Sequence, residues 1–183
     1  KSQYEYIFTR IGLSLNSRNL KQQQNLKCIV TPTTGLNHVD INFAKKNNIR
    51  LQIFGDLKKF PKMLRKSITN AIKLTKKNNN LQINLALNYG SKDEIVRSLK
   101  LITKKKIPIN IKNVEKNLYT SNIPDPDILI RTGNTKRLSN FLLWQLAYTE
   151  IFFEKKLWPA FNEKDYNRII KEYKNIKRNF GKI

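Results

Sequence analysis

Short runs of apolar residues alternate along the chain with segments in which apolar residues recur every three to four positions. The short runs predict buried β-strands, because a strand of a parallel sheet is covered on both faces. The spaced segments predict amphipathic helices. The predicted strands are Cys28–Thr31, Leu51–Phe54, Leu81–Leu87 and Asp127–Arg131, and the predicted helices are Val39–Lys46, Pro61–Lys77, Asp93–Thr103 and Glu163–Arg178.

This alternation predicts an α/β fold, with a mostly parallel sheet and helices on both faces. Ligands in such folds gather at the carboxyl ends of the strands. Three segments directly follow predicted strands: Gly55-Asp56, Asn88-Tyr89-Gly90 and Arg131-Thr132-Gly133. We expect a binding site to be built from them. Lys104–Asn113 is predicted to be an exposed loop, and Ser121–Asp127 an ordered turn.

The segment Phe141–Phe153 is apolar nearly all round and predicts a buried helix, with Ser139 as its N-cap. Glu150 lies within this apolar sequence, and an isolated buried carboxylate is costly, so it should be paired, protonated or bound to metal. Ser139 and Glu150 would lie on one helix face, about three turns apart. Magnesium is usually held by one or two carboxylates plus substrate phosphates. The alternative is that Glu150 pairs with a basic residue or reaches solvent.

Two arginines flank the turn after the predicted strand Asp127–Arg131. Arg131 ends the strand, Arg137 follows six residues later, and Ser139 begins the predicted helix. Guanidinium groups, a hydroxyl group and a helix N-terminus all favour an anion, and arginine binds phosphate oxygens bidentately. The sequence therefore predicts a phosphate site here. The alternative is that both arginines pair with acidic residues of the sheet and Ser139 only caps the helix.

The chain carries 36 basic and 13 acidic residues, a formal net charge of +23. Such a field attracts nucleic acid, anionic lipid surfaces and phosphorylated small molecules. An AT-rich genome would also enrich lysine, asparagine and isoleucine, and most of the lysines are interpreted as solvated charge. No nucleic-acid-binding motif is visible, so no nucleic acid is expected as a partner. Cys28 is the single cysteine, which excludes an intrachain disulfide framework and a cysteine-based zinc site.

No apolar stretch approaches the roughly 20 residues that span a bilayer, and the N-terminus does not have the pattern of a signal peptide. We therefore expect a cytoplasmic protein, either free or in peripheral contact with a membrane.

Several motifs resemble the cis-prenyltransferases, the undecaprenyl diphosphate synthase or isoprenyl transferase family, over about residues 48–181. The most specific block is RLSNFLLWQ, at Arg137–Gln145. The others, in order, are Gly55-Asp56-Leu57, Leu85–Gly90, Asp93-Glu94-Ile95, Pro124–Gly133, Ala147-Tyr148, Glu150, Leu157-Trp158-Pro159 and Arg178–Gly181.

The resemblance implies an enzyme that transfers alkyl groups other than methyl, using magnesium and acting as a homodimer. It would condense isopentenyl diphosphate with an allylic diphosphate into a cis-polyprenyl diphosphate. By matched position, Arg131, Arg137, Leu138 and Ser139 would bind isopentenyl diphosphate, and Glu150 would hold magnesium. Four apolar residues are expected to line or support the tunnel for the growing chain: Leu85, Leu87, Phe141 and Trp144.

The sequence departs from this family in its first part. The Asp-Gly-Asn-Gly-Arg-Trp motif and the later Asn-Trp loop of the family do not occur, so no catalytic residue is assigned. Residues 1–47 are set apart as a strand–helix segment, and Leu26–Ala44 resembles the substrate domain of D-isomer-specific 2-hydroxyacid dehydrogenases. Residues 48–183 then form an incomplete cis-prenyltransferase-like portion. Two alternatives rank below an active enzyme. The first is a catalytically silent diphosphate-binding remnant that dimerises, and the second, less favoured, is a basic nucleic-acid-binding protein.

Overall fold

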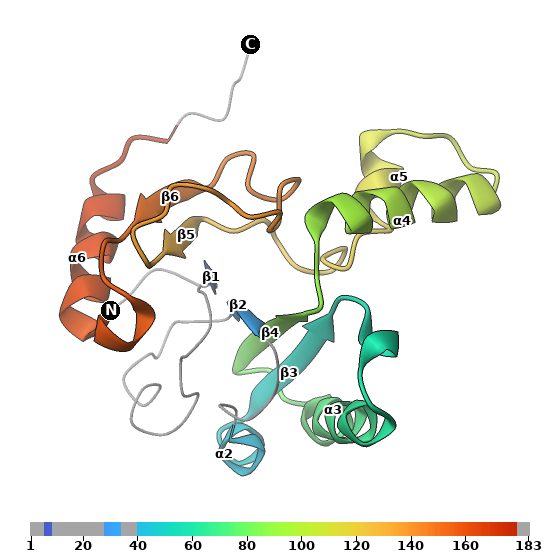
Figure 1. The fold of residues 1–183 in the computed structure, drawn as a ribbon, viewed down its shortest axis with the longest axis horizontal. Coiled ribbons are helices and arrows are strands. Elements are labelled where there is room, and N and C mark those ends of the chain that lie inside the picture. Colours follow the sequence, from blue (N-terminus) through green and yellow to red (C-terminus); the bar gives the residue numbers. More distant parts are fainter. Residues whose placement is uncertain (1–5, 9–27, 34–39, 179–183) are drawn as a thin grey trace.

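A six-stranded parallel sheet forms the centre of the molecule (Figure 1). The structure is a computed structural model that describes residues 6–8, 28–33 and 40–178. The strand order is β3-β4-β2-β1-β5-β6. The strands are β1 Tyr6–Phe8, β2 Cys28–Thr33, β3 Ile49–Phe54, β4 Leu81–Leu87, β5 Ile128–Arg131 and β6 Glu150–Phe153. Every described pairing is parallel, so the carboxyl ends of these strands share one edge.

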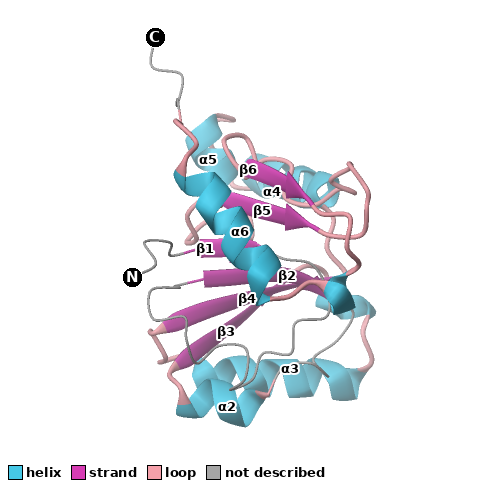
Figure 2. Ribbon diagram, turned by 90° about the vertical axis from the view of Figure 1, so that its left-hand side faces the viewer, coloured by secondary structure: helices cyan, strands magenta, loops and turns pink. Residues whose placement is uncertain are grey.

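Helices connect the strands. They are α2 Ile41–Lys46, α3 Lys62–Thr75, α4 Ser91–Lys104, α5 Ile111–Glu115 and α6 Glu163–Lys174, with short 3-10 helices η1 Leu57–Lys59 and η2 Trp158–Ala160. Figure 2 shows α6 crossing the sheet on one side, with α2 and α3 along its β3 edge. No helix of the described residues is both long and apolar enough to cross a membrane.

One face of the sheet is covered by α2, α3 and α6. Along β4, alternate side chains point to opposite faces, and Ile83 and Leu85 pack with Ile68 and Ala71 of α3. At the other end of the sheet, the apolar residues of β5 pack on α6: Ile128 and Ile130 contact Ile169, Ile170 and Tyr173. Tyr166 packs against both groups, which makes this a continuous core.

The opposite face is covered by the chain between β5 and β6. Leu142 and Leu146 pack there on Phe54, Ala86 and Leu129. A further cluster, which joins α4 and α5 to this crossover, contains Ile102, Val114, Leu118 and Trp144. The predicted α/β class, with a parallel sheet and helices on both faces, is confirmed.

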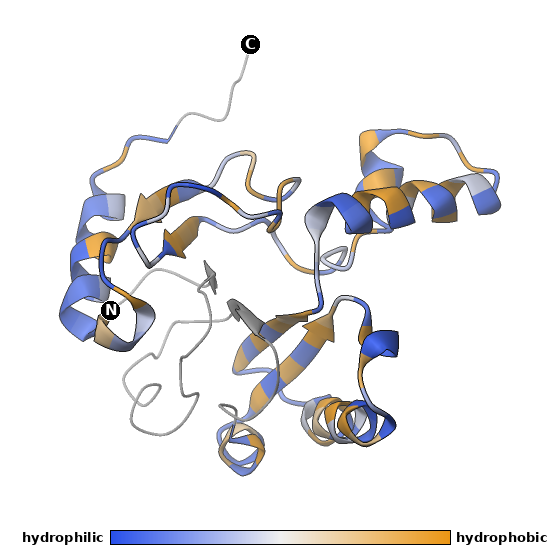
Figure 3. Ribbon diagram, in the orientation of Figure 1, coloured by the Kyte–Doolittle hydropathy of each residue, from blue (hydrophilic) through white to orange (hydrophobic). Residues whose placement is uncertain are grey.

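Polar residues also occupy part of that second face. Figure 3 shows hydrophilic and hydrophobic residues alternating along β3 and β4. The Gln82 Nε2 group donates to Asn84 Oδ1 at 2.8 Å and to Gln52 Oε1 at 3.0 Å. Asn84 is fully buried. Buried amides are tolerated where they hydrogen-bond one another, so this polar row is compatible with the sheet interior.

The four strands predicted from apolar runs are confirmed, and Leu81–Leu87 has the predicted bounds. The predicted loop Lys104–Asn113 is wrong in part, because α5 begins at Ile111. Asn110 caps α5 by accepting a hydrogen bond from the Asn113 N–H group. An asparagine three residues before another polar residue was the available sequence signal. The structure describes the backbone of Cys28 but not its side chain. His38 and residues 179–181 of the last motif lie outside the described residues.

The predicted helix Phe141–Phe153 is wrong. Residues 141–149 form successive turns, and Glu150–Phe153 is strand β6. Ser139, Asn140 and Leu142 have positive φ angles of 52°, 60° and 47°, which a right-handed helix does not allow. An apolar run cannot distinguish a buried helix from a buried crossover and strand, and a parallel β6 requires the chain to return across the sheet.

Candidate functional site

The loops after β3 and β4 are fastened to each other at the carboxyl edge of the sheet. The Asp56 N–H group donates to the Asn88 carbonyl at 3.2 Å, and Asn88 Nδ2 donates to the Asp56 carbonyl at 2.9 Å. Gly55 has a φ angle of 118°, and a Cβ atom there would lie 2.0 Å from the Leu87 carbonyl oxygen. Glycine is required at Gly55 for both reasons. Two of the three segments that the sequence singled out therefore meet.

Arg131 stands at the end of β5, 7% exposed, with its guanidinium in the following loop. Its Nε atom donates to Thr135 Oγ1 at 3.1 Å, and its Nη2 atom donates to Ser139 Oγ at 3.3 Å. The structure thus brings together Arg131 and Ser139, two of the predicted anion ligands. Thr135 was missed, although a hydroxyl group four residues after an arginine was visible in the sequence.

The loop that carries these residues is held by the chain after β6. Gly133 donates its N–H group to the Lys156 carbonyl at 2.8 Å, and Asn134 donates to the Glu154 carbonyl at 3.0 Å. These backbone hydrogen bonds hold the loop in place and so fix the position of Arg131.

Arg137 and Leu138 differ in their surroundings. Arg137 is exposed and forms no ion pair within the described part of the chain. Leu138 is half-buried and packs on the cluster of Leu129 and Leu142. The loop therefore has one buried guanidinium engaged by hydroxyl groups and one exposed guanidinium, with Leu138 anchoring the chain between Arg137 and Ser139. Guanidinium groups form strong, often bidentate hydrogen bonds with phosphate oxygens, so both arginines are suited to an anion.

The first turn of α4 is bound by the residues after Ser139. The Ser91 N–H group donates to the Asn140 carbonyl at 2.8 Å, and the Lys92 N–H group donates to Asn140 Oδ1 at 2.8 Å. In return, Ser91 Oγ accepts from the Leu143 N–H group at 2.9 Å. The free N–H groups at the start of α4 are used by protein atoms, so this helix start supports the loop.

Glu94 is a buried carboxylate, 1% exposed, that ties three segments together. It accepts from the Tyr119 N–H group at 2.6 Å, from Tyr89 Oη at 2.5 Å and from Gln145 Nε2 at 3.3 Å. Burial, and then the hydrogen bond to Glu94, raise the pKa of Tyr89 far above its ordinary value. Three donors offset the cost of burying the charge. The sequence indicated Glu94 only as part of a family motif.

Aromatic rings form a wall beside the same loops. Tyr89 lies 5.3 Å from Phe54 and 5.8 Å from Phe141 between ring centroids. The Arg97 guanidinium stacks 3.9 Å from the Tyr119 ring centre, and burial raises the pKa of Tyr119. These edge-to-face contacts are favourable for aromatic rings.

The four predicted tunnel residues do not lie in one cluster. Leu85 and Leu87 are fully buried on the face covered by α3. Phe141 packs on the opposite face, and Trp144 packs with α4 and α5. A shared lining is therefore not formed by these four side chains.

Glu150 lies far from Arg131 in the folded chain. It opens β6 opposite Ile128, whereas Arg131 is opposite Phe153. Three residues of parallel strand correspond to about 10 Å. The expectation that Ser139 and Glu150 share a helix face is wrong, because the crossover carries the chain from the carboxyl edge of the sheet to its amino edge.

The described residues do not by themselves complete a metal site at the anion loop. No group of three or more His, Cys, Asp or Glu side chains that would hold a metal occurs among them. Magnesium is usually held by one or two carboxylates plus substrate phosphates, and Glu150, about 10 Å from Arg131 along the strands, is the one carboxylate assigned to it by the resemblance.

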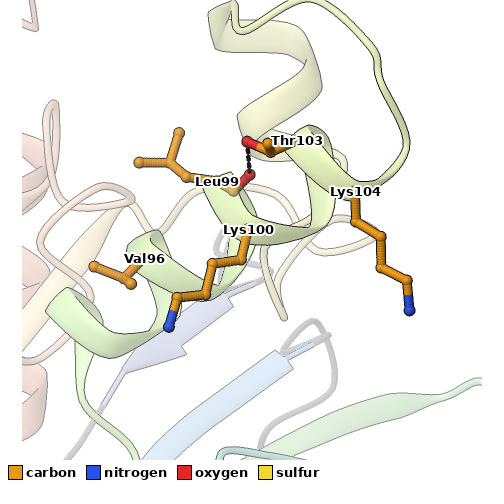
Figure 4. Close-up of a pocket in the computed structure, with 5 residues that line it drawn as sticks. All are labelled: Val96, Leu99, Lys100, Thr103 and Lys104. Carbon is orange, nitrogen blue, oxygen red and sulfur yellow. Dashed lines mark hydrogen bonds between the residues drawn. The ribbon is translucent and has the colours of Figure 1, made fainter.

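A separate hollow of about 460 Å³ lies along α4 (Figure 4). It is lined by Val96, Leu99, Lys100, Thr103 and Lys104. It shares no residue with the Arg131 loop, and all of its lining comes from one helix. The hollow is therefore distinct from the candidate site.

A family comparison covers nearly the whole chain. The family model described as "Putative undecaprenyl diphosphate synthase" matches residues 14–181. The match includes most of the segment 1–47, and the resemblance of that segment to dehydrogenases gains no support from it. The division of the chain at residues 47 and 48 stays a prediction.

Curated relatives and solved structures point the same way. The chain is 43% identical over 153 residues to an isoprenyl transferase of Oceanobacillus iheyensis, covering 80% of this chain and 61% of the relative. It is 45% identical over 139 residues to an isoprenyl transferase of Campylobacter jejuni, covering 75% of this chain and 61% of the relative. The chain thus spans about three fifths of the length of these relatives.

Two solved structures share the fold. A probable undecaprenyl diphosphate synthase from Campylobacter jejuni superposes with a TM-score of 0.83 at 31% identity, over 100% of both chains. A lavandulyl diphosphate synthase from Lavandula x intermedia, solved with dimethylallyl diphosphate, superposes with a TM-score of 0.77 at 23% identity, over 97% of this chain and 98% of that one. The second similarity concerns the fold alone.

Proposed function

We infer that this chain, which belongs to the undecaprenyl diphosphate synthase family, is an isoprenyl transferase that condenses isopentenyl diphosphate with an allylic diphosphate. In this reaction a carbon–carbon bond forms between the two prenyl units, the allylic carbon–oxygen bond breaks and releases diphosphate, and the isopentenyl unit loses a proton. The product is a cis-polyprenyl diphosphate. The observation that carries the proposal is the contact of Arg131 with Ser139 in a loop whose sequence matches the family.

Arg131, Arg137, Leu138 and Ser139 are proposed to bind the diphosphate of the isopentenyl substrate. The guanidinium of Arg131 is already oriented by Thr135 and Ser139, and a phosphate oxygen that replaces one of these partners keeps it hydrogen-bonded. Arg137 is free to close on the anion from solvent. A charge-assisted hydrogen bond contributes about 1.5–3 kcal/mol, so two arginines account for a substantial part of diphosphate affinity.

Magnesium, with Glu150 as a ligand, stays a proposal drawn from the family resemblance. The ion would neutralise the leaving diphosphate. We derive no step through it, because the one predicted carboxylate and the anion loop lie at different ends of β5 and β6.

The test of the binding proposal uses isothermal calorimetry with isopentenyl diphosphate. Arg137→Ala should weaken binding roughly tenfold to a hundredfold, because it removes a charge-assisted contact from an exposed side chain with no structural partner. Arg65→Ala, which removes the same charge from an exposed position on α3, is the matched control and should bind as the parent does. Equal affinities for the parent and Arg137→Ala would remove the assigned role.

A second function is a catalytically silent diphosphate-binding subunit. The observation in its favour is that the family's Asp-Gly-Asn-Gly-Arg-Trp motif does not occur in these 183 residues. Incubation with isopentenyl and farnesyl diphosphates plus magnesium distinguishes the two functions. Elongated product identifies the transferase, whereas binding that depends on Arg137 without product identifies the silent subunit.

A homodimer is proposed as the assembly. The support is that β6 ends the described sheet, beside half-exposed or exposed aromatic residues: Phe153 is 39% exposed and Tyr148 is 60% exposed. An unpaired sheet edge favours association with a second chain. Sedimentation equilibrium should give a dimer for the parent and a monomer for Phe153→Lys. A parent that sediments as a monomer at all concentrations contradicts the proposal.

A further inference from the structure

The outer face of α3 carries an uninterrupted positive charge. Between Leu57 and Lys77 there are eight basic residues and no acidic residue. They are Lys58, Lys59, Lys62, Arg65, Lys66, Lys73, Lys76 and Lys77. All eight are exposed, and none forms an ion pair within the described part of the chain. By contrast, α4 contains Asp93 and Glu94, and α6 contains three acidic residues. Residues 95–114 also lack acidic residues, but they carry six basic residues against the eight of this stretch.

Helical geometry arranges these charges as a stripe. Lys62, Lys66 and Lys73 are spaced by four and seven residues and lie on one line along α3, opposite the buried Ile68 and Ala71. Figure 1 shows α3 beside β3 at the outside of the molecule, and all three lysines are exposed. The stripe, Lys58 and Lys59 of η1, and the neighbouring Arg65, Lys76 and Lys77 form the α3 surface, which is defined by these eight residues.

Two exposed apolar side chains flank the stripe. Met63 is 84% exposed and Leu74 is 44% exposed, and their spacing of three helical turns places them on one side of the lysines. Figure 3 shows hydrophobic and hydrophilic residues side by side along α3. A lysine-rich face with protruding aliphatic side chains fits an anionic lipid surface, where the ammonium groups meet headgroups and the apolar side chains enter the acyl boundary.

We propose that the α3 surface docks the protein on an anionic lipid bilayer. Single-stranded nucleic acid is less suited as the occupant, because its bases stack on exposed aromatic rings. The α3 surface has one arginine, and its nearest aromatic residue, Phe60, is half-buried. The proposal stands independently of catalysis.

Vesicle sedimentation tests this surface with the protein as it exists. The parent should bind phosphatidylcholine vesicles that contain phosphatidylglycerol and should not bind pure phosphatidylcholine vesicles. The variant K62Q/K66Q/K73Q should bind the anionic vesicles about a hundredfold more weakly, because each lysine near the surface contributes about fivefold. The matched control K100Q/K104Q/K112Q removes the same charge from exposed positions on α4 and α5. It should weaken binding to the anionic vesicles by less than about tenfold.

A second variant tests the apolar contribution. Met63→Gln leaves the charge unchanged and should weaken binding severalfold, because an aliphatic side chain no longer enters the lipid. Thermal unfolding of each variant confirms that folding is intact. Equal losses in the two triple variants would show attraction by net charge alone and overturn the proposal. So would the absence of vesicle binding, or binding to single-stranded RNA at physiological salt that the α3 triple variant abolishes while vesicle binding is unchanged.

Discussion

Glu94 shows how one buried residue supports the candidate site. Its two oxygens accept hydrogen bonds from the Tyr119 backbone, the Tyr89 hydroxyl and the Gln145 side chain, which come from three parts of the chain. Gln145 belongs to the crossover that follows the anion loop. Glu94 therefore helps to hold the crossover against α4, although it is not one of the predicted anion ligands.

Replacement of Glu94 by glutamine should lower the free energy of unfolding by about 1–3 kcal/mol, because the new amide group faces donors in a buried site. Urea denaturation measures the change. Glu115→Gln is the control; Glu115 is exposed and accepts one long hydrogen bond, from Trp144 at 3.5 Å, so its effect should stay within about 0.5 kcal/mol. Equal stabilities of the parent and E94Q would show that the network is not a determinant of stability.

Two glycines with positive φ angles allow backbone strain and steric collision to be tested separately. Gly55→Ala should be the more damaging substitution, since its Cβ atom meets the Leu87 carbonyl at 2.0 Å. At Gly133 the φ angle is 92°, but a Cβ atom there meets only Leu157 Cδ2, at 3.8 Å. Gly133→Ala should therefore cost about 1–3 kcal/mol of strain, and Gly55→Ala more than that. Thermal unfolding compares them, and the reverse order would contradict this assignment.

At the scale of elements, the N-terminus of α6 is linked to the anion loop. Asn162 and Asp165 form a capping box, and Asp165 Oδ1 accepts a hydrogen bond from Lys156 Nζ at 2.6 Å. The Lys156 carbonyl in turn accepts from the Gly133 N–H group. Glu154, whose carbonyl accepts from Asn134, pairs with Arg168 of α6. A helix distant in sequence thus helps to hold the segment that fastens the loop.

The hydrogen bond from Lys156, and then the one from the Asn162 backbone, lower the pKa of Asp165 below its ordinary value of 3.8. Because the folded pKa is the lower one, the stabilisation is fully present above about pH 4 and is lost as the pH falls through the folded pKa. Asp165→Asn should therefore flatten the fall in stability below pH 4. Urea denaturation at several pH values measures the slope. A parent and a variant with the same acid slope would remove Asp165 as a source of it.

At the scale of the molecule, the net charge of +23 opposes compactness. Like charges on a folded surface repel, and the Debye length falls to about 10 Å at 0.1 M salt. We expect the melting temperature to rise when sodium chloride is raised from low to physiological concentration. The variant K62Q/K66Q/K73Q should show a smaller rise, because it carries less charge. A melting temperature that is unchanged by salt in both proteins would contradict this expectation.

The local sequence determined four of the six described strands and most helices. Leu81–Leu87 has the length of a strand rather than of a helix, and the spacing in α3 needs only one apolar side, so the local pattern and its length were sufficient for both elements. The pairing of Arg131 with Ser139 was also foreseeable, because the two residues are close in the chain and lie in a motif of high specificity.

The tertiary structure alone decided the path from Phe141 to Phe153. An apolar segment satisfies burial equally as a helix or as a crossover that ends in a strand. The choice depends on hydrogen bonds to α4, between Asn140 and the Ser91 and Lys92 N–H groups, and on the pairing of β6 with β5. These partners lie tens of residues away, beyond the reach of local periodicity. For the same reason the sequence placed Glu150 on one helix face with Ser139, whereas the parallel register placed it at the other edge of the sheet.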